Sequence, residues 1–284
     1  MRYRMLRFPD FKPKAVTFSY DDGCSADKRL ATLMADYGIK GTFNINSSRY
    51  GMNGHLTVQE IKDYILAKGH EIAVHGDFHK ANGNIRPIEG IKDVLDCRLS
   101  LEKEFGIIVR GMAYPDTGVS CFHNGTTYEM VKNYLTELEI AYARALNNYI
   151  DDFSLPQDWH KWLPTAHHNS EGVFEKIETF LNIDLETTYI ARRTPKLFYL
   201  WGHAFELDNK NNWDRMEEIC KKLSNNDEIW YATNMEIYDY ITAYHSLVFS
   251  ADGTLVYNPT LLTVYFDVDG TKYSVNPGET INIK

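Results

Sequence analysis

Apolar and polar positions in the first part of this chain switch between the spacing of strands and the spacing of helices. Residues 14–20, Lys-Ala-Val-Thr-Phe-Ser-Tyr, are rich in β-branched and aromatic side chains and stop at Asp-Asp-Gly, which predicts a strand that ends in a loop. Residues 26–37 then place Leu30, Leu33 and Met34 at helical spacing. The pattern therefore predicts a strand followed by a helix as the first unit of the fold.

The same alternation continues over most of the chain. Because a helix that connects two parallel strands packs on the sheet they form, this order predicts mainly parallel strands with helices outside. We therefore expect a β/α barrel, with its active site at the carboxyl ends of the strands. The further strands are predicted at 41–45, 71–74, 111–114, 197–201 and 229–232, and the further helices at 57–68, 87–105, 126–138, 214–223 and 235–245.

The chain from Leu247 onward has a different pattern. Apolar and polar residues alternate there, and Ala-Asp-Gly, Val-Asp-Gly and Asn-Pro-Gly are turn signals, which predicts antiparallel hairpins. A barrel of about 250 residues accounts for most of the chain, which has 284 residues. We therefore divide the sequence into a barrel domain, 1–245, and a small C-terminal antiparallel β appendage, 246–284.

Composition and charge argue against several classes of protein. Hydrophobic residues make up 44% and charged residues 24% of the chain, which is typical of a globular protein with a sizeable core. The formal net charge is −9, and no basic stretch is interleaved with aromatic residues, so a nucleic-acid partner is not expected. No apolar stretch suits a signal peptide or a membrane span, and the four cysteines form no C-x-x-C pair, so we expect a cytoplasmic protein.

Residues of catalytic type follow several of the predicted strands. Asp21 and Asp22 follow the first strand, His75 and His79 the third, and His203 the apolar strand Leu-Phe-Tyr-Leu-Trp. Two histidines four positions apart lie on one side of a helical turn and suit the capture of one metal ion, although such a pair also arises by chance. A carboxylate from another strand end supplies a third ligand and leaves room for water and substrate. A neighbouring carboxylate is then free to act as a general base, and a histidine across the site as a general acid.

These residues, in this order, resemble the motifs of the polysaccharide deacetylase family, also called the NodB-homology domain or carbohydrate esterase family four. The stretches similar to the five motifs are, in order, Thr-Phe-Ser-Tyr-Asp-Asp-Gly at 17–23, His-Gly-Asp-Phe-His at 75–79, residues 110–115, Asp158-Trp159, and Leu-Trp-Gly-His at 200–203. The likeness extends over most of the barrel domain. It implies that the barrel is somewhat distorted.

The resemblance implies a role for each of the five candidate residues. Asp21 corresponds to the catalytic base, and His203 to the acid that protonates the leaving group. Asp22, His75 and His79 correspond to the ligands of one divalent metal ion, most often zinc. The implied reaction is hydrolysis of an acetylated carbohydrate, most often an N-acetylated amino sugar, to acetate and a deacetylated sugar.

The expected substrate site is assembled from residues near the weaker motifs. Tryptophans are candidates for stacking on sugar rings, although frequent tryptophans also belong to protein cores. The pair His167-His168 fits a substrate contact, a group that supports the reacting residues, or loop polarity. The residues assigned to substrate binding are Pro115, Asp116, Trp159, Trp201, His167 and His168.

The chain departs from the family at Ala113, where the resemblance implies an arginine that orients the base. A substitute cation or hydrogen-bond donor for Asp21 is therefore expected from elsewhere in the chain. Arg110 starts on the opposite face of the predicted strand. We therefore expect His167 or His168 to be the substitute.

Two other functions are compatible with the sequence. The first is hydrolysis of non-sugar amides or cyclic ureides, because branches that resemble this family carry such activities. The second is a carbohydrate-binding pseudoenzyme, for which the altered third motif would be the signal. The presence of Asp21 argues against the pseudoenzyme.

Overall fold

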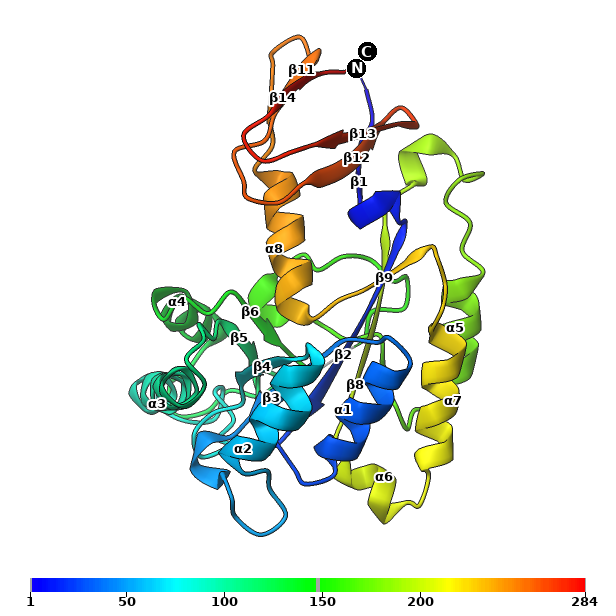
Figure 1. Ribbon diagram of the computed structural model, residues 1–284. Coiled ribbons are helices and arrows are strands. Elements are labelled where there is room, and N and C mark those ends of the chain that lie inside the picture. Colours follow the sequence, from blue (N-terminus) through cyan, green and yellow to red (C-terminus); the bar gives the residue numbers. More distant parts are fainter. Residues whose placement is uncertain (1, 147–148, 284) are drawn as a thin grey trace.

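A curled sheet of parallel strands forms the centre of the protein in the computed structural model, which describes residues 2–146 and 149–283 (Figure 1). Within these residues the sheet has eight strands in the order β6-β5-β4-β3-β2-β8-β7, with β9 also paired to β2. It curls into a half-barrel, so the predicted distorted β/α barrel is confirmed. The strands are β2 (Lys14–Asp21), β3 (Gly41–Ile45), β4 (Glu71–Val74), β5 (Gly111–Ala113), β6 (Tyr142–Arg144), β7 (Ala166–His167), β8 (Lys196–Gly202) and β9 (Ile229–Tyr231).

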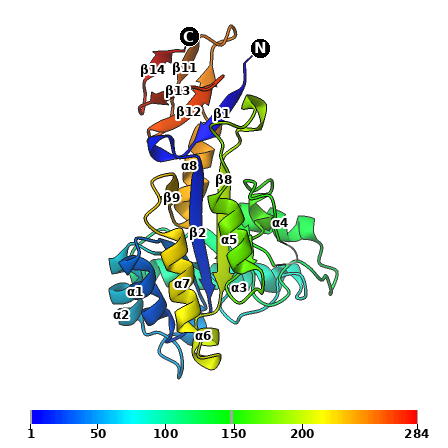
Figure 2. The ribbon, with the colours of Figure 1, turned by 90° about the vertical axis from the view of Figure 1, so that its right-hand side faces the viewer.

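Helices cover the outside of this sheet, as the alternation predicts. Helices α5 and α7 contact each other, and α5 also contacts β8 (Figure 2). Thr57 and Thr233 each accept a backbone N–H in a capping box, which fixes where α2 and α8 begin. The helices are α1 (Asp27–Asp36), α2 (Val58–Glu60, continued by irregular turns to Lys68), α3 (Pro87–Phe105), α4 (Tyr128–Glu137), α5 (Val173–Leu181), α6 (Phe205–Asn209), α7 (Trp213–Leu223) and α8 (Asn234–His245).

The sequence pattern misses the elements between residues 139 and 195. Strand β6 has three residues and β7 has two, and periodicity is not recognisable over so few positions. Both strands nevertheless matter for the site, because they complete the curl of the sheet. The backbone N–H of Trp162, just before β7, donates to the carbonyl of Ala143 at 3.0 Å. The backbone N–H of Ala145 donates to the Trp162 carbonyl, also at 3.0 Å. β6 and β7 are the two end strands of the sheet. These hydrogen bonds therefore connect β6 with the segment that leads to β7.

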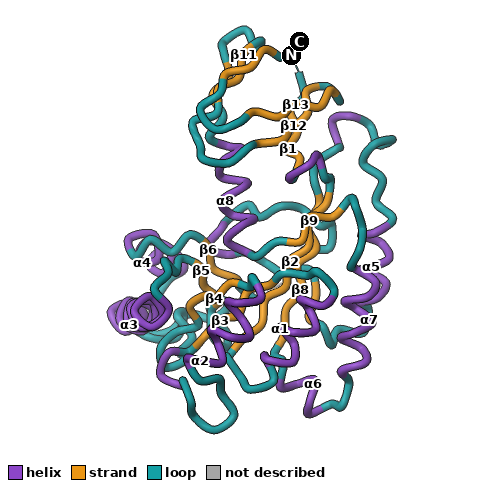
Figure 3. The backbone as a smooth tube through the Cα atoms, viewed as in Figure 1, coloured by secondary structure: helices purple, strands orange, loops and turns teal. Residues whose placement is uncertain are grey.

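The C-terminal appendage consists of two small antiparallel sheets, reached from the barrel through α8 (Figure 3). The N-terminal strand β1 pairs with β12, so both ends of the chain contribute to it. Arg7 and Asp267 form a buried ion pair of 2.6 Å across this pairing. The strands are β1 (Arg4–Arg7), β10 (Val248–Phe249), β11 (Leu255–Tyr257), β12 (Val264–Val268), β13 (Thr271–Val275) and β14 (Thr280–Asn282). No helix of the described residues is long and apolar enough to span a membrane.

Truncation after Ser246 is expected to lower the melting temperature and the solubility of the protein. The truncation removes the strand that pairs with β1, and it takes away the apolar cluster of the appendage, including Phe266, against which Ala243 and Tyr244 of α8 pack. It also removes Asp267, the partner of Arg7. Thermal unfolding of the truncated and full-length chains measures the effect. A truncated protein that melts at the same temperature but no longer binds substrate would contradict a structural role for the appendage.

Candidate active site

Two adjacent carboxylates diverge at the end of β2. Asp21 is the last residue of the strand, and its side chain is buried. Asp22 has a φ of 80°, in the left-handed region, so the chain turns sharply between the two residues. The Asp22 carboxylate faces His75 and His79, whereas that of Asp21 faces Asn44 and Arg144. One turn therefore gives neighbouring carboxylates different surroundings.

The loop after β4 carries His75 and His79. The sequence placed the two histidines on a helical turn, and this is wrong: the segment is an irregular loop, and His79 has a φ of 56°. Asp93 of α3 holds the loop, because its carbonyl accepts the Asp77 N–H at 3.1 Å and its carboxylate accepts the Phe78 N–H at 2.8 Å. The imidazole centroids of His75 and His79 lie 4.9 Å apart. The loop thus brings both rings to one point without helical spacing.

Asp22, His75 and His79 form a candidate metal centre, with ligand atoms that all lie within 4.8 Å of one another. The Asp22 Oδ1 lies 3.8 Å from His75 Nε2 and 3.3 Å from His79 Nε2. Ligand atoms around a tetrahedral zinc ion, each about 2.0–2.1 Å from the metal, lie roughly 3.3 Å apart. The spacing of the three side chains therefore fits one ion with little adjustment.

The groups behind the two imidazoles indicate which ring nitrogen faces the centre. His75 Nδ1 lies 2.9 Å from the Ala113 carbonyl oxygen, and a carbonyl accepts, so Nδ1 carries the proton. The Nε2 atom of His75 is then left with its lone pair toward Asp22 and His79. His79 Nδ1 faces the Asp116 carboxylate at 3.6 Å, which favours the same tautomer. An outer partner that fixes the ring in this way is the usual arrangement of metal-binding histidines.

Asp21 is held by three groups on its other side. Asn44 Nδ2 donates to Oδ1 at 2.8 Å, the Arg144 guanidinium contacts Oδ2, and His203 Nε2 lies 3.9 Å from Oδ2. Burial raises the pKa of the Asp21 carboxyl, but the charge and hydrogen bond of Arg144 and the charge of His203 outweigh burial and hold this pKa below its usual value. Asp21 is therefore an ionised carboxylate outside the metal ligand set.

Arg144 supplies the cation that is expected beside Asp21 in place of an arginine at position 113. The expectation of a substitute cation is confirmed, but its assignment to His167 or His168 is wrong. Arg144 comes from β6, is fully buried, and has its guanidinium carbon 4.8 Å from the centroid of a Trp201 ring. It is the residue paired with Ala113 in the β5–β6 register. Arg144 therefore lies one strand along the sheet from position 113, at the same level.

His203 lies at the end of β8 and faces Asp21. Its Nδ1 lies 3.0 Å from the Glu206 carboxylate in α6. Burial lowers the pKa of His203, but the Glu206 hydrogen bond and the charges of Asp21, Asp22 and Glu206 outweigh burial and raise this pKa above its usual value. The ring is thus placed to carry a proton close to the base.

The predicted substrate residues fall into two groups. Asp116 is exposed beside His79, the buried Pro115 precedes it, and the Trp201 ring contacts both His167 and His203, so these residues border the candidate centre. His168 is fully buried behind the site, where it contacts Tyr20 and Asn169. The prediction that His168 contacts substrate is therefore corrected, because none of its surface is accessible.

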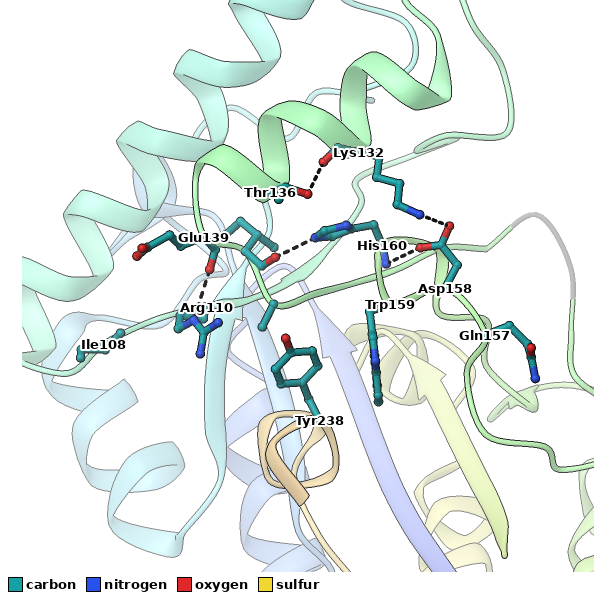
Figure 4. Close-up of a pocket in the computed structure, with 12 residues that line it drawn as sticks. Ile108, Arg110, Lys132, Thr136, Glu139, Gln157, Asp158, Trp159, His160 and Tyr238 are labelled. Atoms are coloured by element: carbon teal, nitrogen blue, oxygen red, sulfur yellow. Dashed lines mark hydrogen bonds and ion pairs between the residues drawn. The ribbon is translucent and has the colours of Figure 1, made fainter. Parts of the chain in front are cut away.

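Trp159 and Asp158 lie away from the candidate centre. Trp159 packs against Trp162 and Tyr238, and Asp158 pairs with Lys132 at 2.9 Å (Figure 4). The cavity of about 690 Å³ beside them includes Arg110 and Ala141, which directly precede β5 and β6. This cavity thus lies at the amino ends of the strands, whereas Asp21 follows a carboxyl end. The predicted contact of Trp159 with substrate is corrected accordingly.

Three functional candidates are absent from the sequence prediction. Asn44 contacts Asp21 from the neighbouring strand, and no local pattern distinguishes it. Arg144 lies in the unpredicted strand β6, so its sequence offers no signal either. Glu206 follows His203 by three positions, and that spacing on a helical turn was a usable signal.

Comparison with known proteins supports the family likeness. Residues 9–135 match the family model described as polysaccharide deacetylase. A Mycobacterium smegmatis structure described as a polysaccharide deacetylase is 16% identical, with a TM-score of 0.59 over 86% of this chain and 96% of that chain. A family 4 acetyl xylan esterase from Clostridium thermocellum, solved with a cobalt ion, is 16% identical, with a TM-score of 0.50 over 79% of this chain and 90% of that chain.

An enzyme of another name shares the fold. Puue allantoinase is 12% identical, with a TM-score of 0.59 over 84% of this chain and 93% of that chain. No curated protein sequence matches the chain. At these identities the solved structures support the fold, and the match of residues 9–135 supports the family. The resemblance of this chain to the polysaccharide deacetylase family is thereby confirmed.

Proposed function

We propose that this protein is a metal-dependent hydrolase that removes acetyl groups from N-acetylated sugars. The observation that carries the proposal is the division of labour between two adjacent carboxylates. The Asp22 carboxylate lies close to the Nε2 atoms of both histidines, where one metal ion could bind. The Asp21 carboxylate points away from this place, and Arg144 keeps it ionised. A metal ligand and a separate base, side by side, are what hydrolysis by an activated water requires.

Zinc is the metal we propose for the candidate centre. One carboxylate and two imidazoles are the ligand set of several catalytic zinc sites, which keep further positions open. The Nδ1–H of His75 donates to the Ala113 carbonyl, so its Nε2 is available as a ligand. A divalent ion bound here would supply a Lewis acid for the acyl carbonyl and for water.

The residues of the chain then have distinct tasks. Asp21 accepts the proton of the attacking water, and Asn44 and Arg144 hold its carboxylate in one orientation. His203 protonates the departing amine nitrogen, because its raised pKa keeps the imidazolium form available. Trp201, whose ring contacts that of His203, provides an apolar wall for the sugar.

The direct test is acetate release from N-acetylglucosamine oligomers by the metal-loaded protein. We expect turnover on these substrates and none on cyclic ureides such as allantoin. Ureide hydrolysis without acetate release would favour the second candidate, with which the allantoinase fold agrees. Oligomer binding without turnover would instead indicate a carbohydrate-binding pseudoenzyme.

Removing a ligand is expected to remove the metal. The loss of outer hydrogen-bond partners alone lowers metal affinity by about 10–100-fold, so His75→Ala is expected to lower zinc affinity by at least about 100-fold. His245→Ala is the control, because His245 is exposed in the last turn of α8. Elemental analysis after dialysis against zinc measures both. Equal zinc content in His75→Ala and wild type would show that the ion is bound elsewhere.

A further inference from the structure

A second cluster of polar side chains lies behind His203, at the ends of β7 and β8. His167 Nε2 lies 3.2 Å and Asn169 Nδ2 2.8 Å from Glu206 Oε2, and His203 Nδ1 lies 3.0 Å from Oε1. Ligand atoms of His167, His203 and Glu206 are close enough together for a metal ion. The cluster therefore has two interpretations, a second metal site or a hydrogen-bonded support for one carboxylate.

The protonation of His167 decides against a metal ion. The backbone N–H of Asn169 donates to His167 Nδ1 at 3.1 Å, so Nδ1 holds a lone pair. The ring proton of neutral His167 is therefore on Nε2, the atom that faces Glu206. Metal binding at Nε2 would require the ring proton on Nδ1. Two N–H donors, those of His167 Nδ1 and the Asn169 backbone, would then face each other, and the hydrogen bond between them would be lost. His75 has the reverse arrangement, with its proton on the nitrogen that faces away from its cluster.

The side chain of Asn169 is oriented by its other neighbour. Asn212 Nδ2 donates to Asn169 Oδ1 at 2.8 Å, so the Asn169 amide nitrogen faces Glu206 and His168. His168 Nε2, 2.8 Å from this nitrogen, then accepts, and its Nδ1 donates to the Tyr20 hydroxyl at 3.2 Å. Burial lowers the pKa of His168 to about 4, which keeps the ring neutral. His168 thus supports Asn169 rather than the substrate.

The Glu206 carboxylate is consequently fixed by N–H groups at both oxygens. His167 and Asn169 donate to Oε2, which leaves Oε1 to accept the Nδ1–H of His203. Burial raises the pKa of Glu206, but the hydrogen bonds from His167 and His203, together with the charge of His167, outweigh burial and hold this pKa well below its usual value. A charged acceptor that cannot rotate is a strong constraint on the ring that it faces.

We propose that Glu206, held by His167 and Asn169, is the positioning residue that fixes the tautomer of His203. With its proton on Nδ1, His203 presents Nε2, 3.9 Å from the Asp21 carboxylate, as the nitrogen that gains and loses the catalytic proton. This inference rests on the proposed role of His203 as the acid. It also gives the pair His167-His168 a function that the sequence left open.

Several charged or titratable groups face His203 from different elements. Asp21 and Asp22 come from the end of β2, Glu206 from α6, and His168 from the segment after β7. The two aspartates stabilise the imidazolium in every variant that retains them. A substitution of Glu206 therefore removes one of three favourable charges, and the expected change in pKa is moderate.

The test is Glu206→Gln, read by ¹⁵N NMR of labelled histidine, with the His203 signal assigned from a His203→Ala sample. The glutamine oxygen must face the two donors, His167 and Asn169, so its NH₂ group faces His203 Nδ1. We expect the His203 proton to move to Nε2 and the pKa of His203 to fall by about one pH unit. Glu217→Gln is the matched control, because exposed Glu217 accepts a hydrogen bond from Tyr37 on the outer surface.

Kinetics provide the second readout. Because imidazolium is the active form, a lower pKa shifts the alkaline limb of kcat/KM to lower pH. In Glu206→Gln we expect kcat on amide substrates to fall about 10-fold or more with KM nearly unchanged. In Glu206→Asp, which keeps a carboxylate, we expect the alkaline limb of kcat/KM to return part of the way to its wild-type pH. A structural role alone would lower the melting temperature without moving the limb.

The outcomes separate this inference from the proposed function. The NMR measurement needs no substrate, so it remains decisive if the wild type releases no acetate. An unchanged His203 tautomer and pKa in folded Glu206→Gln would overturn the positioning role, and Glu206→Ala, which also removes the acceptor for His203 Nδ1, answers the same question if the glutamine variant does not fold. Binding of a second zinc ion that is lost in His167→Ala would overturn the assignment of the cluster as a support.

Discussion

Asp21→Asn is expected to lower kcat/KM for deacetylation by about 10²–10⁴-fold, which is the usual contribution of a positioned general base. The substitution replaces the carboxylate that accepts the proton with an amide, which is not a base, and it keeps the size of the side chain. The amide oxygen still accepts from Arg144, whose guanidinium contacts Asp21 Oδ2 in the wild type. The metal ligands Asp22, His75 and His79 are untouched.

The same variant should therefore keep its metal. Zinc content near that of wild type, together with lost turnover, is the combination that identifies Asp21 as base rather than ligand. Asp22→Asn is the matched comparison, because it removes one charge at the neighbouring position and is expected to weaken zinc binding. Near-full turnover in Asp21→Asn, or loss of zinc in Asp21→Asn but not in Asp22→Asn, would reverse the two roles.

Much of the fold follows from local sequence patterns. The predicted strand 14–20 is observed as β2 (Lys14–Asp21), and the predicted helix 87–105 as α3 (Pro87–Phe105). Such elements are long enough to show their periodicity, and Pro87 and Gly106 mark the ends of α3. Because Asp22 and His75 follow long or strongly apolar strands, the sequence also predicts that they meet at one end of the sheet.

The parts that sequence could not supply depend on contacts between distant segments. Arg144 lies in a strand of three residues, and its importance comes from Asp21, 123 positions away in the chain. Trp159 illustrates the opposite error, because an aromatic residue near a motif was taken for a sugar contact and packs instead against Trp162. Side-chain chemistry alone does not distinguish a stacking platform from a core residue.

The position of Arg144 leads to an expectation with a large effect on both stability and rate. Arg144→Ala leaves the buried Asp21 carboxylate without its cation, and removing one partner of a buried ion pair costs about 3–5 kcal/mol. Because Asp21 and Arg144 act on each other, the double variant Arg144→Ala/Asp21→Asn should lose less free energy of unfolding than the sum of the single variants. Urea denaturation of all three measures this coupling.

Turnover should also fall in Arg144→Ala, because the base then loses the hydrogen bond from Arg144 and keeps that from Asn44. We expect a loss of about 10-fold or more in kcat, the scale of effect that misplacement of a reacting group produces. A folded Arg144→Ala variant with wild-type kcat would show that the arginine stabilises the core without assisting the reaction.

A stricter test of this role moves the arginine from position 144 on β6 to position 113 on β5. Ala113 and Arg144 are paired in register on adjacent parallel strands, and paired residues point to the same face of a sheet. Ala113→Arg in the Arg144→Ala background places a guanidinium at the level of the one removed and fills the space that the alanine leaves. We expect the combined variant to recover part of the lost stability and kcat. Ala113→Arg alone is the control, because two arginines compete there for one carboxylate and one volume, so it should be destabilised by overpacking. A combined variant less stable and less active than Arg144→Ala itself would show that the two positions are not equivalent in supporting Asp21.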